Sequence, residues 1–482
     1  MKSIFFCFFF FLILSLNAQP PSKFFSRWGG SGHEVGYDIK ETLDKGYIIT
    51  GSTTSFGYGN TDLYLVKLDS MGRQQFEVSF GGLGNEIGKS VVQLPDSNFV
   101  AVGYTNSDGL GGYDIFLVKI DPLGKLLWKK NIGGEDWDFA NSLQCTLDGG
   151  LIIAGYTYSL GKGKSDGYLI KTDRNGTVIW SKTFGGKADD EFKSLIMTSH
   201  GDLAMVGYTK SYGDSLGDAW ILKTNINGDS LWGKVYGGNR EDFATDIIEN
   251  KLGYLFVSGA TASFGSGLLD AYAFYTDSMG NIIHSDISGT SSSNEIYQSV
   301  TISKKTSDDI VCFIQKGNFP GFNMQTKIIE YDFGLNYRKA TDYGSVDKDE
   351  TFKVISTSDK GYAFVGYTNG YDAHLSDVYF VKLDSDLVGG NFSIVSLEEL
   401  SKKDDRLIIF PNPVSDKLYI YTGTNFYDLN IELFDLFGNK KEVKNEFKEN
   451  KITILDLYDL ADGMYVLKIG NKQEKIMVLK KM

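Results

Sequence analysis

Short apolar runs alternate with breaks rich in glycine, asparagine and aspartate along most of the chain. In one representative stretch the runs are residues 87–94, 99–104, 114–120 and 126–132. They are rich in valine, isoleucine and aromatic residues, which is typical of β-strands. The break at residues 121–124 is typical of a tight hairpin turn, in which glycine supplies a positive φ angle. The pattern therefore predicts an all-β protein built from units of four antiparallel strands.

The four-strand unit recurs every 52 residues. A Gly-Gly pair opens each copy, and its first members are Gly29, Gly81, Gly133, Gly185 and Gly237. Two further landmarks recur in the same phase, namely Asp62, Asp114, Asp166, Asp218 and Asp270, and Gly51, Gly103, Gly155, Gly207 and Gly259. A period near 50 residues with four strands in each copy predicts the blades of a β-propeller.

The ends of the repeat region predict a closed ring. Degenerate copies bring the number of repeats to seven, and the last of them has no fourth strand before residue 390. Residues 24–28, which precede the first Gly-Gly pair, align with a fourth strand that has no blade of its own. We expect this N-terminal strand to complete the seventh blade and remove an open sheet edge. The sixth copy is the least regular, so six blades plus an irregular unit remain the alternative.

The repeat ends at residue 390, and residues 391–405 have the composition of a linker. The propeller is therefore assigned to residues 19–390 and a second module to residues 406–482. Short alternating apolar patches in this module, such as residues 452–457 and 464–469, predict a small antiparallel β-sandwich.

The C-terminal module carries motifs in a characteristic order. A Pro-Asn-Pro triplet comes first, a Gly-Met-Tyr segment follows, and two lysines lie at the end; the residues concerned are Pro411, Asn412, Pro413, Gly463, Tyr465, Lys480 and Lys481. This module closely resembles the type A sorting domain of the type IX secretion system. The resemblance implies a Bacteroidota source, transfer across the outer membrane by the type IX machinery, and release or surface attachment. The repeats resemble the propeller copies common in such secreted proteins.

The N-terminus has the features of a secretory signal peptide. Lys2 precedes an apolar run over residues 4–14, and Ala18 suits the position before a cleavage site. Residues 1–18 are therefore predicted to be removed on export. No later segment approaches 18 continuous apolar residues, so we expect no transmembrane segment in the mature chain.

Composition narrows the range of partners. The chain has 48 lysines and arginines against 61 aspartates and glutamates, a net charge of −13. This charge argues against nucleic acid as a ligand. The four histidines are scattered and show no metal-ligand or triad spacing.

The direction in which the strands run brings two candidate sites to one face of the ring. An acidic residue begins the first strand of each copy, at Glu34, Glu86, Asp138, Asp190 and Asp242, with Glu295 and Asp349 as weaker counterparts. Such a ring of carboxylates could hold a hard cation such as Ca²⁺. The structural alternative is that each carboxylate accepts backbone N–H bonds and locks the ring, and its repetition in every copy favours this alternative. We expect no other cofactor.

A tyrosine ends the second strand in four copies, at Tyr104, Tyr156, Tyr208 and Tyr367. These residues lie beside the loop to the third strand, which is rich in threonine, glycine and aromatic residues. Loops on a rigid scaffold are common binding surfaces, and the tyrosines could stack on a sugar or a peptide. The alternative is that they pack between blades.

Together these features predict a secreted or surface-displayed, non-enzymatic propeller that recognises a glycan, a peptide or a surface protein. No catalytic residue is assigned. The alternative is a secreted hydrolase or lyase with a carboxylate or Ca²⁺ site at the mouth of the channel.

Overall fold

The computed structural model describes residues 23–388, except 267, 307–308, 318–324, 346, 371–372 and 374. In the C-terminal part it describes residues 407–410, 417–422, 431–435, 439–448, 452–457, 459–461, 463–469 and 472–478. The predicted signal peptide, the linker at 391–405, and Pro411, Asn412, Pro413, Lys480 and Lys481 lie outside these residues. The chain divides into two compact units, 1–390 and 391–482, which are described separately.

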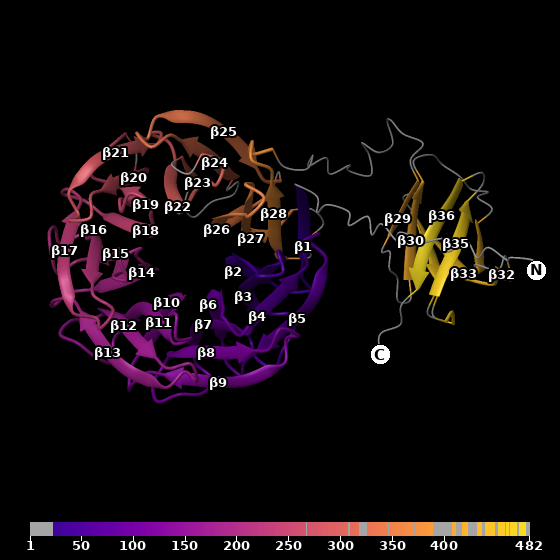
Figure 1. Cartoon of the computed structure of the whole chain (residues 1–482), viewed down its shortest axis with the longest axis horizontal. Helices are drawn as coiled ribbons and strands as arrows, with labels where there is room; N and C mark the ends of the chain where they lie inside the picture. The colour runs from indigo at the N-terminus through magenta and orange to yellow at the C-terminus, as the bar shows by residue number, and fades with distance from the viewer. Residues whose placement is uncertain are drawn as a thin grey trace, which may run out of the picture. The chain divides into compact units, whose positions relative to one another are not determined.

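The described residues of the first unit form seven four-stranded antiparallel sheets, or blades, arranged in a ring (Figure 1). The first three blades are β2 (Glu34–Glu41), β3 (Tyr47–Thr53), β4 (Asp62–Leu68) and β5 (Gln74–Phe80); β6 (Glu86–Gln93), β7 (Phe99–Thr105), β8 (Asp114–Ile120) and β9 (Leu126–Ile132); β10 (Asp138–Cys145), β11 (Leu151–Thr157), β12 (Asp166–Thr172) and β13 (Val178–Phe184). The next two are β14 (Asp190–Met197), β15 (Leu203–Thr209), β16 (Asp218–Thr224) and β17 (Ser230–Tyr236); β18 (Asp242–Glu249), β19 (Leu255–Thr261), β20 (Asp270–Thr276) and β21 (Ile282–Ser288).

The sixth blade is a four-stranded sheet like the others, built from β22 (Asn294–Ile302), β23 (Ile310–Gly317), β24 (Gln325–Tyr331) and β25 (Tyr337–Tyr343). The seventh contains β26 (Asp349–Ser356), β27 (Tyr362–Thr368) and β28 (Asp377–Leu383). The fourth strand of the seventh blade is β1 (Phe24–Trp28), which pairs antiparallel with β28, Phe24 opposite Lys382 and Trp28 opposite Val378. The predicted propeller fold and its closure by the N-terminal strand are confirmed.

The position of a strand within a blade determines its burial. The second and third strands carry almost continuous buried residues, as in β3, β4 and β8. Both faces of these strands are covered by the neighbouring blades, so their sequences are apolar rather than alternating. The outermost strands, such as β9, are half exposed, and the innermost strands β2, β6, β10, β14, β18, β22 and β26 surround the central channel (Figure 1).

The C-terminal unit contains two four-stranded antiparallel sheets. One has the order β29-β30-β34-β33 and the other β32-β31-β35-β36. Their bounds are β29 (Leu407–Phe410), β30 (Lys417–Thr422), β31 (Ile431–Asp435), β32 (Lys440–Lys441), β33 (Lys444–Lys448), β34 (Ile452–Asp456), β35 (Gly463–Ile469) and β36 (Lys472–Val478). Leu418, Leu433, Leu455 and Leu467 contribute to a core shared by both sheets. Within this unit Gly463 begins β35, and the Tyr465 hydroxyl donates to the Ala461 carbonyl at 2.9 Å.

The described residues contain no helix long and apolar enough to cross a bilayer. Cys145 and Cys312 are both free thiols, Cys312 being buried in the sixth blade.

Candidate functional site

The acidic residues that begin the innermost strands are fully buried and bonded within their own repeat. Glu34 accepts the Gly30 N–H at 2.7 Å and the Thr53 hydroxyl at 2.7 Å. The same bond to the second glycine of the Gly-Gly pair is made by Glu86, Asp138, Asp190 and Asp242, at 2.7, 2.8, 2.8 and 2.9 Å. These bonds fix the turn that leads from one blade into the next, which is a structural use of the carboxylates.

A second carboxylate, from the preceding blade, meets each of these residues across the first glycine of the pair. A Cβ on Gly81 would lie 2.2 Å from Asp62 Oδ1 and 2.2 Å from Glu86 Oε2, so only glycine fits between them. Burial raises the pKa of Asp62, and the charge of Glu86 raises it further, although the Gly59 N–H bond opposes both. In the described part of the chain no group of three histidine, cysteine, aspartate or glutamate residues is placed to hold a metal ion. The structure therefore places these carboxylates in the blade junctions.

The innermost strand of every blade contains one β-bulge at the same position. In β2, Gly36 pairs with Gly51 and Asp38 with Thr50, so Tyr37 is an extra residue in the register. The equivalent extra residues around the ring are Tyr37, Lys89, Asn141, Lys193, Thr245, Gln298 and Phe352. They differ from blade to blade, although the glycines and carboxylates around them repeat. Bulges commonly redirect a side chain beside a functional site.

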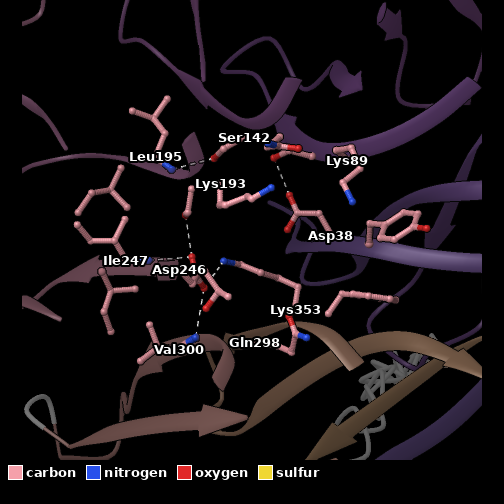
Figure 2. Close-up of a pocket in the computed structure, with 18 of the residues that line it drawn as sticks. Asp38, Lys89, Ser142, Lys193, Leu195, Asp246, Ile247, Gln298, Val300 and Lys353 are labelled. Carbon is pink, nitrogen blue, oxygen red and sulfur yellow. Dashed lines mark hydrogen bonds and ion pairs between the residues drawn. The ribbon is translucent and has the colours of Figure 1, made fainter. Parts of the chain in front are cut away.

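All seven bulge residues line a single cavity in the central channel, with a volume of about 480 Å³ (Figure 2). The residues directly after the bulges form a belt of hydrogen bonds centred on two aspartates. Asp38 accepts the Ser90 hydroxyl at 2.9 Å, and Asp246 accepts the Ser299 hydroxyl at 2.7 Å and the Lys353 amine at 2.6 Å. Although burial raises the pKa of Asp246, the charge of Lys353 and the serine hydroxyls hold it below its ordinary value. This belt links residues of different blades and contributes polar groups to the cavity lining.

The four predicted tyrosines lie half-buried at the end of the second strands and contact residues of the innermost strands. Tyr156 stacks on Phe139 with ring centroids 4.8 Å apart, and Tyr104 meets the same ring edge-on at 4.9 Å. The Tyr208 hydroxyl donates to Glu191 at 3.0 Å. On the seventh blade, the Tyr367 hydroxyl donates to Glu350 at 2.8 Å. The structure therefore brings Tyr104 and Tyr156 into one group and places Tyr208 next to a charged residue.

Three aromatic residues that sequence reasoning did not select extend this group outward. Tyr113 lies 5.9 Å from Trp137, which lies 6.2 Å from Tyr158. We call Tyr104, Tyr113, Trp137, Phe139, Tyr156 and Tyr158 the aromatic cluster. Trp137 remains 48% exposed, so the cluster runs from the channel wall to the loop surface of blades two and three.

Two lysines among the bulge residues were also missed. The Lys193 amine lies 5.6 Å from the Tyr156 ring centroid and 5.7 Å from that of Tyr208. The Lys89 amine lies 3.9 Å from the Tyr37 centroid. Burial and the charge of Lys193 lower the pKa of Lys89 to about 8. One signal in the sequence could have revealed both lysines. The residue type at the bulge position changes from copy to copy, whereas the glycines and carboxylates around it repeat.

Comparison with known proteins identifies a family for the C-terminal unit. Residues 408–482 match the family described as a secretion system C-terminal sorting domain. Together with the sorting motifs, this match shows a type IX sorting domain and indicates export to the cell surface or the medium. The predicted sorting domain and the predicted secreted or cell-surface location are confirmed.

The remaining likenesses are distant. The chain is 28% identical over 189 residues to regulatory protein FlaEY of Caulobacter vibrioides, covering 33% of this chain and only 20% of that protein. A structure of PorZ, a surface component of the type IX system of Porphyromonas gingivalis, aligns over 92% of this chain and 59% of its own, with 12% identity and a TM-score of 0.44. The gluconolactonase PpgL of Pseudomonas aeruginosa aligns over 73% and 97%, with 11% identity and a TM-score of 0.43. None of these likenesses assigns an activity.

Proposed function

We propose that this exported propeller is a non-enzymatic binding protein whose ligand enters the channel mouth and packs on the aromatic cluster. The observation that carries the proposal is that the cluster adjoins the cavity: the amine of Lys193, which lines the cavity, lies 5.6 Å from the Tyr156 ring centroid, while Trp137 is exposed at the outer end of the cluster. Rigid aromatic rings supply contact area at low entropic cost, and their faces suit the apolar faces of sugar rings. A saccharide is therefore the favoured ligand over a peptide or a surface protein.

The alternative, a hydrolase or lyase acting through carboxylates of the mouth, has less support. The two carboxylates beside the predicted tyrosines are already engaged by cations. Glu191 lies 2.5 Å from the Lys193 amine, and Glu350 lies 3.6 Å from that of Lys348. Such ion pairs occupy the carboxylate oxygens that a general acid or base has to present to its substrate.

A glycan and peptide array tests the proposal. We expect the propeller to bind one saccharide class, and Trp137→Ala and Tyr156→Ala each to weaken that binding about tenfold, which corresponds to about 1.4 kcal/mol. The matched control is Tyr337→Ala, because Tyr337 is 65% exposed on the outer strand β25. Unchanged binding by both cluster variants, or equal loss in the control, would contradict the proposed site.

A further inference from the structure

The channel cavity is cationic although the chain as a whole is acidic. The charged residues that line it are four lysines and two aspartates: Asp38, Lys40, Lys89, Lys193, Asp246 and Lys353. Lys40 pairs with Asp38 at 2.8 Å and Lys353 with Asp246 at 2.6 Å. Within each pair the positive and negative charges cancel. Lys89 and Lys193 are then the charged residues of the lining that remain to be considered.

Lys89 and Lys193 differ in how they are compensated. Lys193 is held by Glu191, which lies outside the cavity lining. Among the residues that the structure describes, none forms an ion pair with Lys89, whose close contact is the ring of Tyr37. The group formed by Lys89, Lys193 and Glu191 therefore carries one surplus positive charge at the cavity wall. Figure 2 shows Lys89 and Lys193 extending into the open space of the cavity, whereas Lys353 reaches Asp246.

A surplus charge that is partly withdrawn from water is stabilised when an anion compensates it. The lowered pKa of Lys89 has the same cause, since burial and the charge of Lys193 both disfavour the ammonium form, while Glu350 acts in the opposite direction. A single surplus charge matches a carboxylate better than a dianionic phosphate. Lysine also suits this role because its ammonium group is a compact point charge with three donors.

We propose that the channel mouth selects acidic saccharides, with the ligand carboxylate bound between Lys89 and Lys193 and an adjoining sugar ring packed against the aromatic cluster. This inference rests on the proposed function and specifies its substrate class. The Lys193 amine lies 5.6 Å from the Tyr156 ring centroid, so a ligand that packs against the aromatic cluster also meets the cationic wall. The aromatic cluster then supplies contact area, and the lysines favour an acidic ligand over a neutral one.

The test compares two probes of the same shape, trigalacturonate and its fully methyl-esterified form, by isothermal titration calorimetry on the full chain. We expect the acid to bind at least tenfold more tightly than the ester. Lys89→Met should reduce this preference to about twofold or less, and Lys89→Arg should retain most of it. The control is Lys125→Met, because Lys125 lies in the hairpin between β8 and β9, away from the channel. Unchanged melting temperatures establish that the variants fold.

The pH dependence provides a second readout. Affinity for the acid should fall as the pH rises from 7 to 9.5, because Lys89 loses its proton near its pKa of about 8. The groups that face it are Tyr37, Lys193 and Glu350; burial raises the pKa of Tyr37, so its ring stays neutral over this range. Affinity for the ester should not change.

The possible outcomes distinguish the acidic-saccharide inference from the proposed binding function. Equal binding of acid and ester, weakened by Tyr156→Ala, overturns this inference and leaves the proposed function standing. Preference for the acid that survives Lys89→Met also overturns it. Binding of neither probe overturns it too, and the array then decides the proposed function separately. Tighter, lysine-dependent binding of a tri-aspartate peptide would replace the saccharide with a peptide ligand.

Discussion

A chain that lacks residues 23–28 is expected to lose about 5 kcal/mol of unfolding free energy, because Phe24 and Trp28 are partly buried and each contributes a share of the about 3–5 kcal/mol of a fully buried aromatic side chain. Phe24 and Trp28 of β1 pack on Phe380 with ring centroids 5.4 and 6.0 Å apart, and Arg27 pairs with Asp377. Their removal also exposes β28 as an open sheet edge. Urea unfolding followed by intrinsic fluorescence measures the loss.

Two controls accompany this deletion. Lys23→Ala removes only an exposed ion pair at 3.9 Å to Asp384 and should change stability by less than about 0.5 kcal/mol. A synthetic peptide of residues 23–28, added at millimolar concentration, should restore part of the loss by re-forming the pairing with β28. Wild-type stability in the deleted chain would show that the ring does not depend on β1 for its closure.

Gly81→Ala is expected to cost about 2–4 kcal/mol, because the added methyl group must displace two hydrogen-bonded carboxylates. Its Cβ would lie 2.2 Å from oxygens of both Asp62 and Glu86, and Glu86 could move only by losing the Gly82 N–H bond at 2.7 Å. Thermal unfolding measured by circular dichroism gives the change.

The control is Gly233→Ala in the outer strand β17, where the nearest atom to a Cβ, on Leu222, lies at 3.4 Å. This variant should be neutral or slightly more stable, since alanine reduces the entropy of the unfolded chain. A cost at Gly81 no larger than at Gly233 would mean that the blade junctions are not tightly packed around the glycine.

The propeller could be predicted because its landmarks are forced by close contacts that recur in most of the blades. Gly81 separates two carboxylates, and a Cβ on Gly103 would lie 1.7 Å from the Ile87 carbonyl oxygen of the adjacent strand. Because only glycine fits at such positions, glycine recurs in the sequence at a constant spacing. In the C-terminal unit the edge strand β33 was not predicted, because its sequence Lys-Asn-Glu-Phe-Lys lacks an apolar pattern. Polar edges are common in sheets and carry little strand signal.

The candidate site was predicted only in part, and the reason lies in the bulges. The tyrosines could be selected because they repeat, but Lys89 and Lys193 occupy a position where an extra residue breaks the alternation of the strand. Simple period-two reasoning cannot assign a direction to such a residue. The repeated carboxylates were considered for a cation site, although their repetition favoured a structural role; in the structure they bond within the blade junctions, and the variable bulge residues line the cavity.

Hydrogen–deuterium exchange with the tightest-binding array compound tests most directly whether the channel mouth is the binding site. Bound ligand should slow exchange in the three loops that flank the aromatic cluster, residues 106–113, 133–137 and 158–165. The hairpins at residues 121–125 and 173–177, at the other ends of the strands, should exchange as in the free protein. Slower exchange in these hairpins with no change in the three loops would place the ligand elsewhere and contradict the account.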